Sequence, residues 1–236
     1  MKRRTKILLS SFVLVLLALA IPEVLHENEG KSRATGSPGK GTIENAWLIP
    51  YFGPNYRYFS PLSYYLLDRG YAHHRVHDAI LAAYETCATT CPEVKFRLME
   101  CGNKRGGKMW PHRTHQAGLS ADFMLPKVKN EKPHRWFDRL GVWHYLLQTD
   151  AAGNYTSRVR IDFETTARHL LALDDAARKN GLRIKKVILK IELKDDFLKT
   201  KSGKKVKARG IYFARSLPNI VNQLHDDHYH VDFSLK

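Results

Sequence analysis

The chain has 236 residues, of which 43% are hydrophobic and 26% are charged, proportions that are ordinary for a globular protein and exclude a disordered or fibrous chain. Its formal net charge of +16 and its pI of about 9.8 favour polyanionic partners, whether nucleic acid, acidic envelope polymers or lipid headgroups. The length accommodates a leader and one well-filled domain of about 190 residues.

The first residues have the pattern of a secretory signal. Four basic residues, Lys2, Arg3, Arg4 and Lys6, precede an apolar run over residues 7–21. Near the end of this run, Ala18 and Ala20 are small residues at the spacing of a cleavage site. The run is shorter than the ~20 residues of a membrane-spanning helix. We therefore expect residues 1–21 to act as a signal peptide or, if uncleaved, as an N-terminal anchor. Export argues against a nucleic-acid partner and for an envelope partner.

The next segment, residues 22–41, is rich in glycine, serine, proline and charge, and is predicted to be a linker. A single domain is expected over residues 42–236. Ser60 and Pro61 are typical of a helix start, with serine as the N-cap and proline at the first helical position. A short helix is therefore predicted over residues 62–67.

A longer helix is predicted over residues 74–86, because its apolar side chains fall on one stripe: Val76, Ile80, Ala83 and Tyr84. Residues 94–99 alternate apolar and basic side chains, as a strand does. Three cysteines lie in this region. In an oxidising compartment one pair could close, and pairing of Cys91 with either Cys87 or Cys101 is compatible with the spacing.

Beyond residue 125, residues 126–133 are predicted to form a charged loop, whereas the apolar and aromatic segment 136–147 does not decide between helix and strand. Asp162 is typical of an N-cap and Gly181 of a C-terminal helix stop, so a helix is predicted over residues 163–180.

The last part of the chain is predicted to hold a strand over residues 187–193, a basic loop or short helix over residues 194–209, and a helical turn led by residues 216–218. Helices and strands mix along the chain, and strands must pair with partners distant in sequence. An α+β fold with a central, mostly antiparallel sheet and flanking helices fits this order best.

The chemistry-bearing side chains in the middle of the chain lie in residues 105–125, RGGKMWPHRTHQAGLSADFML. Glycine and proline interrupt this segment, so His112 and His115 are expected on a loop. Residues 121–125 predict a short buried strand that carries Asp122 at its start. Imidazole and carboxylate groups are ligands suited to zinc, but a histidine and an aspartate alone do not complete a site.

The missing ligand is expected from residues 225–233, HDDHYHVDF. Side chains alternate along a strand, so the apolar and polar residues of this segment fall on opposite faces. The apolar face is expected against a core: Tyr229, Val231, Phe233 and Leu235. The polar face brings both histidines to one side of the sheet: His228, His230, Asp232 and Ser234.

Zinc catalysis needs about three protein ligands and an open position for water. We expect His115, Asp122 and His230 to be these ligands, because two neutral imidazoles and one carboxylate leave a net positive charge that lowers the pKa of a bound water to about 7. His228 is then expected to accept the water's proton or to stabilise an oxyanion.

Either Asp226 or Asp227 is expected to hold one of these rings in a single tautomer. The other histidines lack a partner at ligand spacing and are expected at the surface or satisfied in the core: His73, His74, His134, His144 and His169. The sequence therefore predicts a metal-dependent hydrolase.

These two motifs resemble those of the penicillin-insensitive murein endopeptidase family, among the lysostaphin, D-Ala-D-Ala carboxypeptidase and hedgehog-type (LAS) metallopeptidases. In that family Gly-Gly, then Pro-His, Ser/Thr-His-Gln-x-Gly-Leu and an Asp are paired with His-Asp-Asp-His-aromatic-His. The resemblance implies a LAS-type fold with a Zn²⁺ cofactor held by His115, Asp122 and His230, and His228 as the catalytic base. It also implies that His112 and His225 lie beside the metal.

The substrate that the resemblance implies is the D-alanyl to meso-diaminopimelyl cross-link of peptidoglycan, in the periplasm of a Gram-negative bacterium. Arg105 is a further candidate, as an anchor for a substrate carboxylate through its guanidinium fork; a surface or structural arginine is the alternative. Other functions also fit: a D,D-carboxypeptidase or dipeptidase acting on stem peptides, or a non-catalytic envelope-binding module with a closed, structural zinc site. Nucleic-acid binding by residues 194–209 would conflict with export.

Overall fold

The computed structural model describes residues 12–13, 15 and 21–236. The predicted signal peptide or anchor at residues 1–21 therefore lies almost entirely outside the described residues. Within these ranges, no helix is both long enough and apolar enough to cross a membrane.

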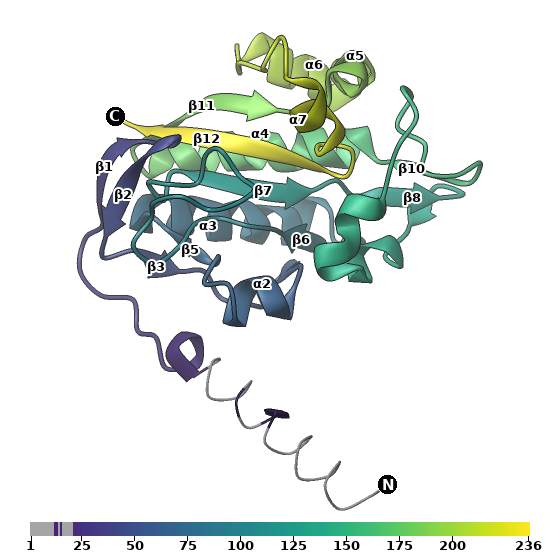
Figure 1. Ribbon diagram of the computed structural model, residues 1–236. Coiled ribbons are helices and arrows are strands. Elements are labelled where there is room, and N and C mark those ends of the chain that lie inside the picture. Colours follow the sequence, from purple (N-terminus) through teal and green to yellow (C-terminus); the bar gives the residue numbers. More distant parts are fainter. Residues whose placement is uncertain (1–11, 14, 16–20) are drawn as a thin grey trace, which may run out of the picture.

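A mixed five-stranded sheet forms the centre of the protein, in the order β11–β12–β7–β6–β4 (Figure 1). Its strands are β4 (Tyr56–Tyr58), β6 (Phe96–Leu98), β7 (Ser120–Met124), β11 (Leu182–Ile188) and β12 (His228–Leu235). All neighbours pair antiparallel except β4 and β6, which are parallel. The predicted α+β class is confirmed, and the parallel pair at one edge makes the sheet mixed.

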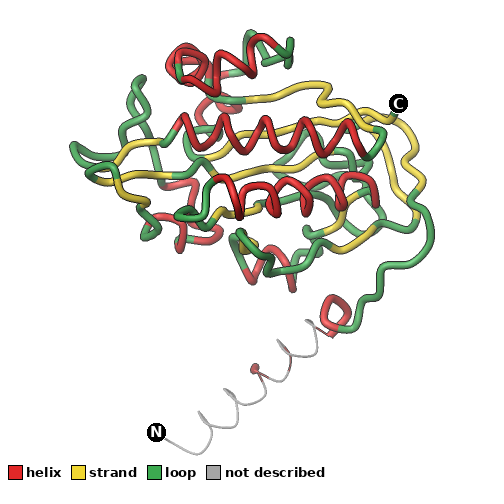
Figure 2. Tube along the Cα trace, turned by 180° about the vertical axis from the view of Figure 1, so that it is seen from behind, coloured by secondary structure: helices red, strands yellow, loops and turns green. Residues whose placement is uncertain are grey.

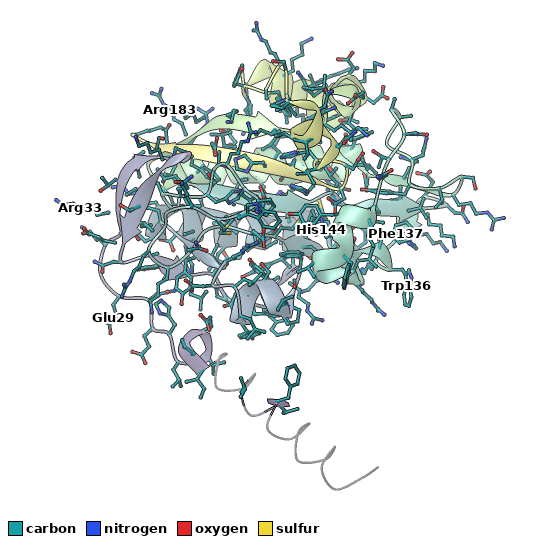
Figure 3. All side chains as sticks on the ribbon, in the orientation of Figure 1. Glu29, Arg33, Trp136, Phe137, His144 and Arg183 are labelled. Carbon is teal, nitrogen blue, oxygen red and sulfur yellow. The ribbon has the colours of Figure 1, made fainter. Side chains whose placement is uncertain are left out.

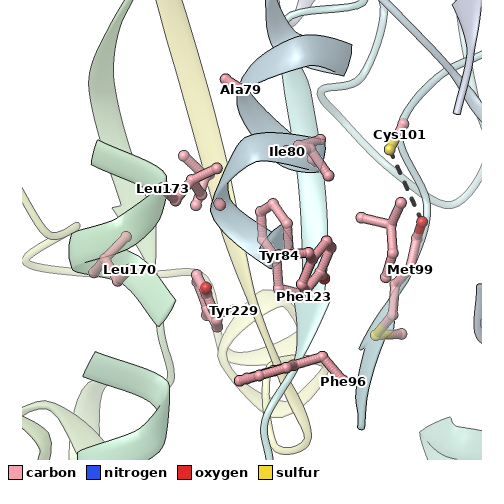
Figure 4. Close-up of a cluster of buried hydrophobic side chains, with 14 of the residues drawn as sticks. Ala79, Ile80, Tyr84, Phe96, Met99, Cys101, Phe123, Leu170, Leu173 and Tyr229 are labelled. Carbon is pink, nitrogen blue, oxygen red and sulfur yellow. Dashed lines mark hydrogen bonds between the residues drawn. The ribbon is translucent and has the colours of Figure 1, made fainter. Parts of the chain in front are cut away.

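Two long helices, α3 (His74–Thr90) and α4 (Phe163–Lys179), lie side by side across one face of this sheet (Figure 2). Apolar side chains of both helices and of the strands are buried between the helices and the sheet. Figure 4 shows part of this cluster: Ala79, Ile80, Tyr84, Phe96, Phe123, Leu170, Leu173 and Tyr229. The core therefore lies between the sheet and this helical layer, and the opposite face of the sheet is left for other elements.

Local helix signals behave as the sequence predicts. Ser60 caps α2 (Pro61–Tyr65) by accepting a hydrogen bond from the Ser63 backbone N–H at 3.3 Å. Asp162 caps α4 in the same way, because its Oδ1 accepts from the Thr165 N–H at 3.0 Å. Gly181 follows α4 with a φ of +68°, the left-handed conformation that ends helices.

The predicted linker is corrected in part, because its second half forms a hairpin of β1 (Arg33–Ser37) and β2 (Lys40–Glu44). Pro38 and Gly39 form its turn, and Gly36 in β1 has a φ of +83° at a position where a Cβ would lie 2.2 Å from the Lys40 carbonyl oxygen. Beside this hairpin, β3 (Trp47–Leu48) pairs with β5 (Tyr71–Ala72).

The charged loop predicted over residues 126–133 is also wrong, since β8 (Lys127–Lys129) and β9 (Lys132–Pro133) form a tight hairpin there that pairs with β10 (Val159–Ile161). Lys127 is a buried cation, and its Nζ lies 3.1 Å from Asp138 Oδ1. A carboxylate 11 residues further along the chain, beyond the hairpin, therefore allows the basic side chain of Lys127 to be buried. The unassigned segment beyond it forms η1 (Phe137–Arg139) and η2 (Gly141–Leu146).

The strand predicted over residues 187–193 is displaced: β11 ends at Ile188, and η3 (Ile191–Leu193) follows. A register shift between Ile184 and Lys186 interrupts the alternation of apolar and basic residues within β11, so the period-2 pattern of a strand is not continuous along it. The basic segment after it is helical, as α5 (Lys194–Lys199) and α6 (Lys201–Ala208), and the predicted last turn is α7 (Asn219–Gln223). The three cysteines, Cys87, Cys91 and Cys101, are buried and free.

The core histidine of α4 predicts a pH dependence of stability. His169 is buried with its Nδ1 against the Tyr229 hydroxyl, and burial lowers its pKa from 6.5 to about 3. Between these two pKa values the His169 imidazole is protonated in the unfolded chain but neutral in the folded protein. The free energy of unfolding therefore falls as the pH drops from 6.5 towards 3. We expect a slope of up to about 1.4 kcal/mol per pH unit from this residue.

Urea unfolding of the wild type and of a His169→Gln variant across this pH range measures that slope. The variant is expected to show a shallower loss of stability on acidification, whereas His134→Gln, outside the core, should follow the wild type. Equal slopes in all three proteins would show that another group dominates the acid response.

Candidate metal centre

The pairing of β7 with β12 brings the two sequence motifs together. In their antiparallel register, His230 lies directly opposite Asp122, and the next residue, Val231, lies opposite Ala121. Because side chains alternate along a strand, Tyr229 and Val231 enter the core under the helices. His230 and Asp122 therefore share the other face of the sheet.

A loop over residues 101–119 lies across this face and supplies the two remaining histidines. Its conformation depends on left-handed residues, among them Gly118 and His115, with φ values of +65° and +68°. Only glycine fits at position 118, where a Cβ would lie 2.5 Å from Ile43 Cδ1 and 2.9 Å from the His73 nitrogen. Close packing therefore fixes where the loop places His112 and His115, which are on a loop as predicted.

Three imidazoles converge on the buried carboxylate of Asp122. His115 Nε2 lies 3.2 Å and His112 Nδ1 lies 3.6 Å from Asp122 Oδ2, and His230 Nδ1 lies 2.7 Å from Oδ1. The ligand atoms of His112, His115 and Asp122 all lie within 4.8 Å of one another, a spacing suited to a metal ion. His115 and Asp122, two of the predicted ligands, belong to this group together with His112, whereas the third predicted ligand, His230, contacts Asp122 but is not part of the group at metal spacing.

Each ring is held through the nitrogen that faces away from Asp122. His112 Nε2 contacts Glu100 Oε2, His115 Nδ1 contacts the Cys101 carbonyl, and His230 Nε2 lies 2.7 Å from Asp232 Oδ1. Such outer partners fix the tautomer and orientation of metal-binding histidines. The inner nitrogens are thereby left to face a common point.

Glu100 is one of these partners that sequence reasoning missed. Its carboxylate also accepts from Arg69 Nη1 and Ser63 Oγ, both at 2.7 Å. Burial alone would raise the pKa of Glu100, but His112 and Arg69 lower it to about 2, so the side chain stays ionised. Nothing near residue 100 in the sequence marks this role, because the contact spans a loop and a strand end.

The state of His115 is compatible with a cation in this group. Burial lowers the pKa of His115, so the ring is neutral, and its Nδ1 must donate to the Cys101 carbonyl, which can only accept. The lone pair therefore resides on Nε2, which is buried, faces Asp122, and has no hydrogen-bond partner among the described residues. A lone pair aimed at a carboxylate repels it unless a positive ion lies between them.

His230 differs in charge. Burial favours its neutral form, but the carboxylates of Asp232 and Asp122 raise its pKa to about 9. Asp232 is in turn held by Ser120 Oγ at 2.7 Å and by Lys186 Nζ at 2.9 Å. Binding of a metal ion by Nδ1 of His230 would release the proton on that nitrogen, while Asp232 would keep the proton on Nε2.

The other histidine of the strand motif, His228, belongs to a second buried group. Its Nδ1 lies 2.9 Å from Asp227 Oδ1, and the other oxygen of Asp227 lies 2.8 Å from His144 Nδ1. Burial would lower the pKa of His228, but Asp227 raises it. Asp227 thus takes the orienting position expected of one acidic neighbour, whereas Asp226 instead binds Lys190 and Thr149. His144, predicted to lie at the surface or satisfied in the core, is buried and paired with Asp227, but its place beside His228 was not predicted.

Both groups border a cleft of about 450 Å³. His112, Asp122, His225, His228 and His230 line one part of it, and apolar residues of the α7 region line another, with Trp110 beside them: Leu217, Pro218, Ile220, Val221 and Leu224. His225 is therefore placed beside the cleft as expected. Arg105 is not, since it is exposed and lines a separate hollow with His26 and Glu29.

A second hollow of about 310 Å³ adjoins the first, because Thr114 and Lys186 line both. The tip of the β1–β2 hairpin forms its wall at residues 37–39, with Lys185 and Tyr212 also lining it. The part of the chain that was predicted as a linker therefore shapes the surroundings of the site.

No family model matches the chain, and no curated protein is significantly similar to it.

The histidine group predicts zinc-dependent stabilisation. Added Zn²⁺ is expected to raise the melting temperature, with a gain of about 2.7 kcal/mol in the free energy of unfolding at a hundredfold excess over Kd. Asp122→Asn should lose this gain, because the carboxylate is the anionic member on which the rings converge. Calorimetric titration and thermal unfolding measure both effects.

Asp78→Asn is the matched control, because the Asp78 carboxylate pairs with His77 and does not line the cleft. It should bind zinc like the wild type. Equal zinc affinity in the Asp122 variant would place the ion elsewhere.

Proposed function

We propose that the protein is a zinc-dependent endopeptidase of the LAS type that hydrolyses D-alanyl to meso-diaminopimelyl cross-links in peptidoglycan. The observation that carries the proposal is a buried carboxylate surrounded by three oriented imidazoles at the border of an open cleft that also contains His228. In this proposal His115, Asp122 and His230 hold the ion, and His112, whose contact with Asp122 is the longest, lies beside it.

The ligand chemistry suits zinc, since imidazole nitrogen and carboxylate oxygen are its common protein ligands. When bound, zinc supplies a Lewis acid that polarises a carbonyl and acidifies water. A purely structural zinc site would be closed by four protein ligands and shielded from solvent. Here Asp122, His112 and His230 line the cleft, which supports a site that substrate reaches.

His228 is the proposed general base. Its Nδ1 contacts the carboxylate of Asp227, which orients the ring. Nε2 does not take part in this contact, and the His228 side chain lines the cleft. In a peptide hydrolysis this nitrogen would accept a proton from water and return it to the leaving amine. Asp227 stabilises the imidazolium that forms in between.

The shape of the surroundings supports an endopeptidase over a carboxypeptidase. The two adjoining hollows share Thr114 and Lys186 but are otherwise lined by different segments, which supports room for a chain that continues on both sides of the cleaved bond. A carboxypeptidase, which removes a terminal residue, needs only one such hollow for the peptide chain. The apolar α7 wall suits the aliphatic parts of a stem peptide, and the basic chain suits an acidic envelope polymer.

Digestion of purified, cross-linked murein tests the reaction. With zinc restored, dimeric muropeptides are expected to fall to monomers in mass spectra, and the chelated protein should leave them intact. Loss of a terminal D-alanine with dimers intact would assign a carboxypeptidase instead. Unchanged muropeptides despite bound zinc would leave an envelope-binding module.

His228→Ala separates catalysis from metal binding. We expect turnover to fall about 10²- to 10⁴-fold with zinc content unchanged, because the general base is lost while the metal group is kept. Steady-state kinetics and metal analysis measure the two quantities. His134→Ala, away from the cleft, should retain full activity, and loss of zinc together with turnover in the His228 variant would make His228 a ligand.

A further inference from the structure

A buried histidine that does not border the cleft completes the surroundings of His228. His144 is 1% exposed, lies on η2 (labelled in Figure 3), and is absent from the cleft lining, as is Asp227. Its Nδ1 is 2.8 Å from Asp227 Oδ2, while the Nδ1 of His228 is 2.9 Å from Asp227 Oδ1. A single carboxylate therefore holds two imidazoles, one on each oxygen.

Both contacts have the geometry of N–H···O hydrogen bonds, and a carboxylate accepts through both oxygens. The proton of each ring therefore resides on Nδ1, and His228 presents its Nε2 away from Asp227. With both oxygens engaged, the carboxylate cannot rotate without breaking a buried hydrogen bond. Without His144, one oxygen of Asp227 would be left unpaired in the interior, and the carboxylate would turn to find another donor.

His144 is itself fixed by its neighbours. Phe59 meets its ring edge to face, with centroids 5.4 Å apart at 84°, and the Tyr145 ring lies 3.9 Å away. The backbone of Asp227 is anchored separately, because its carbonyl accepts from the Leu125 N–H at 2.8 Å. The donor and the acceptor are thus held by different parts of the fold, so the contact between them is preset by the tertiary structure.

We propose that His144 is a positioning residue, which fixes the Asp227 carboxylate by hydrogen bonding and thereby aims His228 into the cleft. The inference rests on the proposed function in that His228 is taken as the general base. His144 does not line the cleft and contacts none of the proposed metal ligands among the described residues. It reaches His228 through the hydrogen bond to Asp227, and its ring also meets the His228 ring edge to face, with centroids 5.7 Å apart. A phenylalanine at position 144 keeps a ring for the second contact and removes only the first.

The same three side chains are spaced to hold a second metal ion. Hydrogen bonds of 2.8 and 2.9 Å account for their arrangement with no ion, since two ring N–H groups meet two carboxylate oxygens. A second bound metal, lost on changing His144, would replace positioning by ligation as the role of this residue.

Paired substitutions of His144 test the proposal. His144→Asn places an amide N–H close to the position of Nδ1 and is expected to keep most of the wild-type kcat. His144→Phe keeps a ring but removes the donor, and is expected to lower kcat about 10- to 100-fold with little change in KM. His144→Gln places its amide further out, near the position of Nε2, so it also removes the donor at Nδ1 and is expected to lower kcat in the same way. It replaces the phenylalanine variant in the test if that variant does not fold.

A second readout does not need turnover. Nitrogen NMR of the His228 ring reports its tautomer, which should be the Nδ1–H form in the wild type and His144→Asn, and a mixture in His144→Phe. Metal analysis should give one zinc in every variant. Melting temperatures show whether each variant is folded at the assay temperature.

The outcomes separate the two proposals. A wild type without activity on murein would overturn the proposed function, while the tautomer measurement would still test the role of His144. Equal losses of kcat in the asparagine and phenylalanine variants, or an unchanged His228 tautomer in both, would overturn positioning. A drop from two bound zinc ions to one would do the same.

Discussion

The antiparallel register between β7 and β12 is the constraint on which the candidate site depends. It sets Asp122 opposite His230 across 108 residues of sequence, on the face of the sheet that the long helices do not cover. A slip of one residue would turn His230 into the core and Tyr229 into the cleft. The apolar face of the same strand prevents that slip, because Tyr229 and Phe123 pack under α3 and α4. Hydrophobic burial on one side thus fixes the chemistry on the other.

The histidines then depend on hydrogen bonds made away from the point where they converge. Carboxylates or a carbonyl hold the outer nitrogens, and the acidic partners carry counter-charges of their own: Arg69 beside Glu100 and Lys186 beside Asp232. Burying so many ionisable groups is costly unless each is paired. Within the described part of this group, His115 Nε2 has no hydrogen-bond partner and faces the Asp122 carboxylate, an arrangement compatible with a cation between them.

Elements near the surface shape the access to this group. The β1–β2 hairpin and α7 come from opposite ends of the described chain, yet their residues line adjoining hollows that share Thr114 and Lys186. A third segment, η2, brings His144 to Asp227. A rigid sheet therefore positions the reactive groups, while connecting segments determine what reaches them and how His228 is held.

Local patterns in the sequence determined the helix caps, the α+β class, and the alternation that puts His228 and His230 on one face, because these features depend on neighbours a few residues apart. The candidate metal ligands followed from residue type and spacing. Only the tertiary structure decided the hairpin at residues 33–44, the buried Lys127, and the contacts of Glu100 and His144, because each depends on a contact that no local pattern reveals. The hairpin turn accepts a hydrogen bond from the Gln116 N–H, Lys127 and Glu100 pair with side chains beyond an intervening loop, and His144 pairs with Asp227, 83 residues away. A side chain's chemistry is local, but whether it is buried, paired or exposed is set by long-range packing.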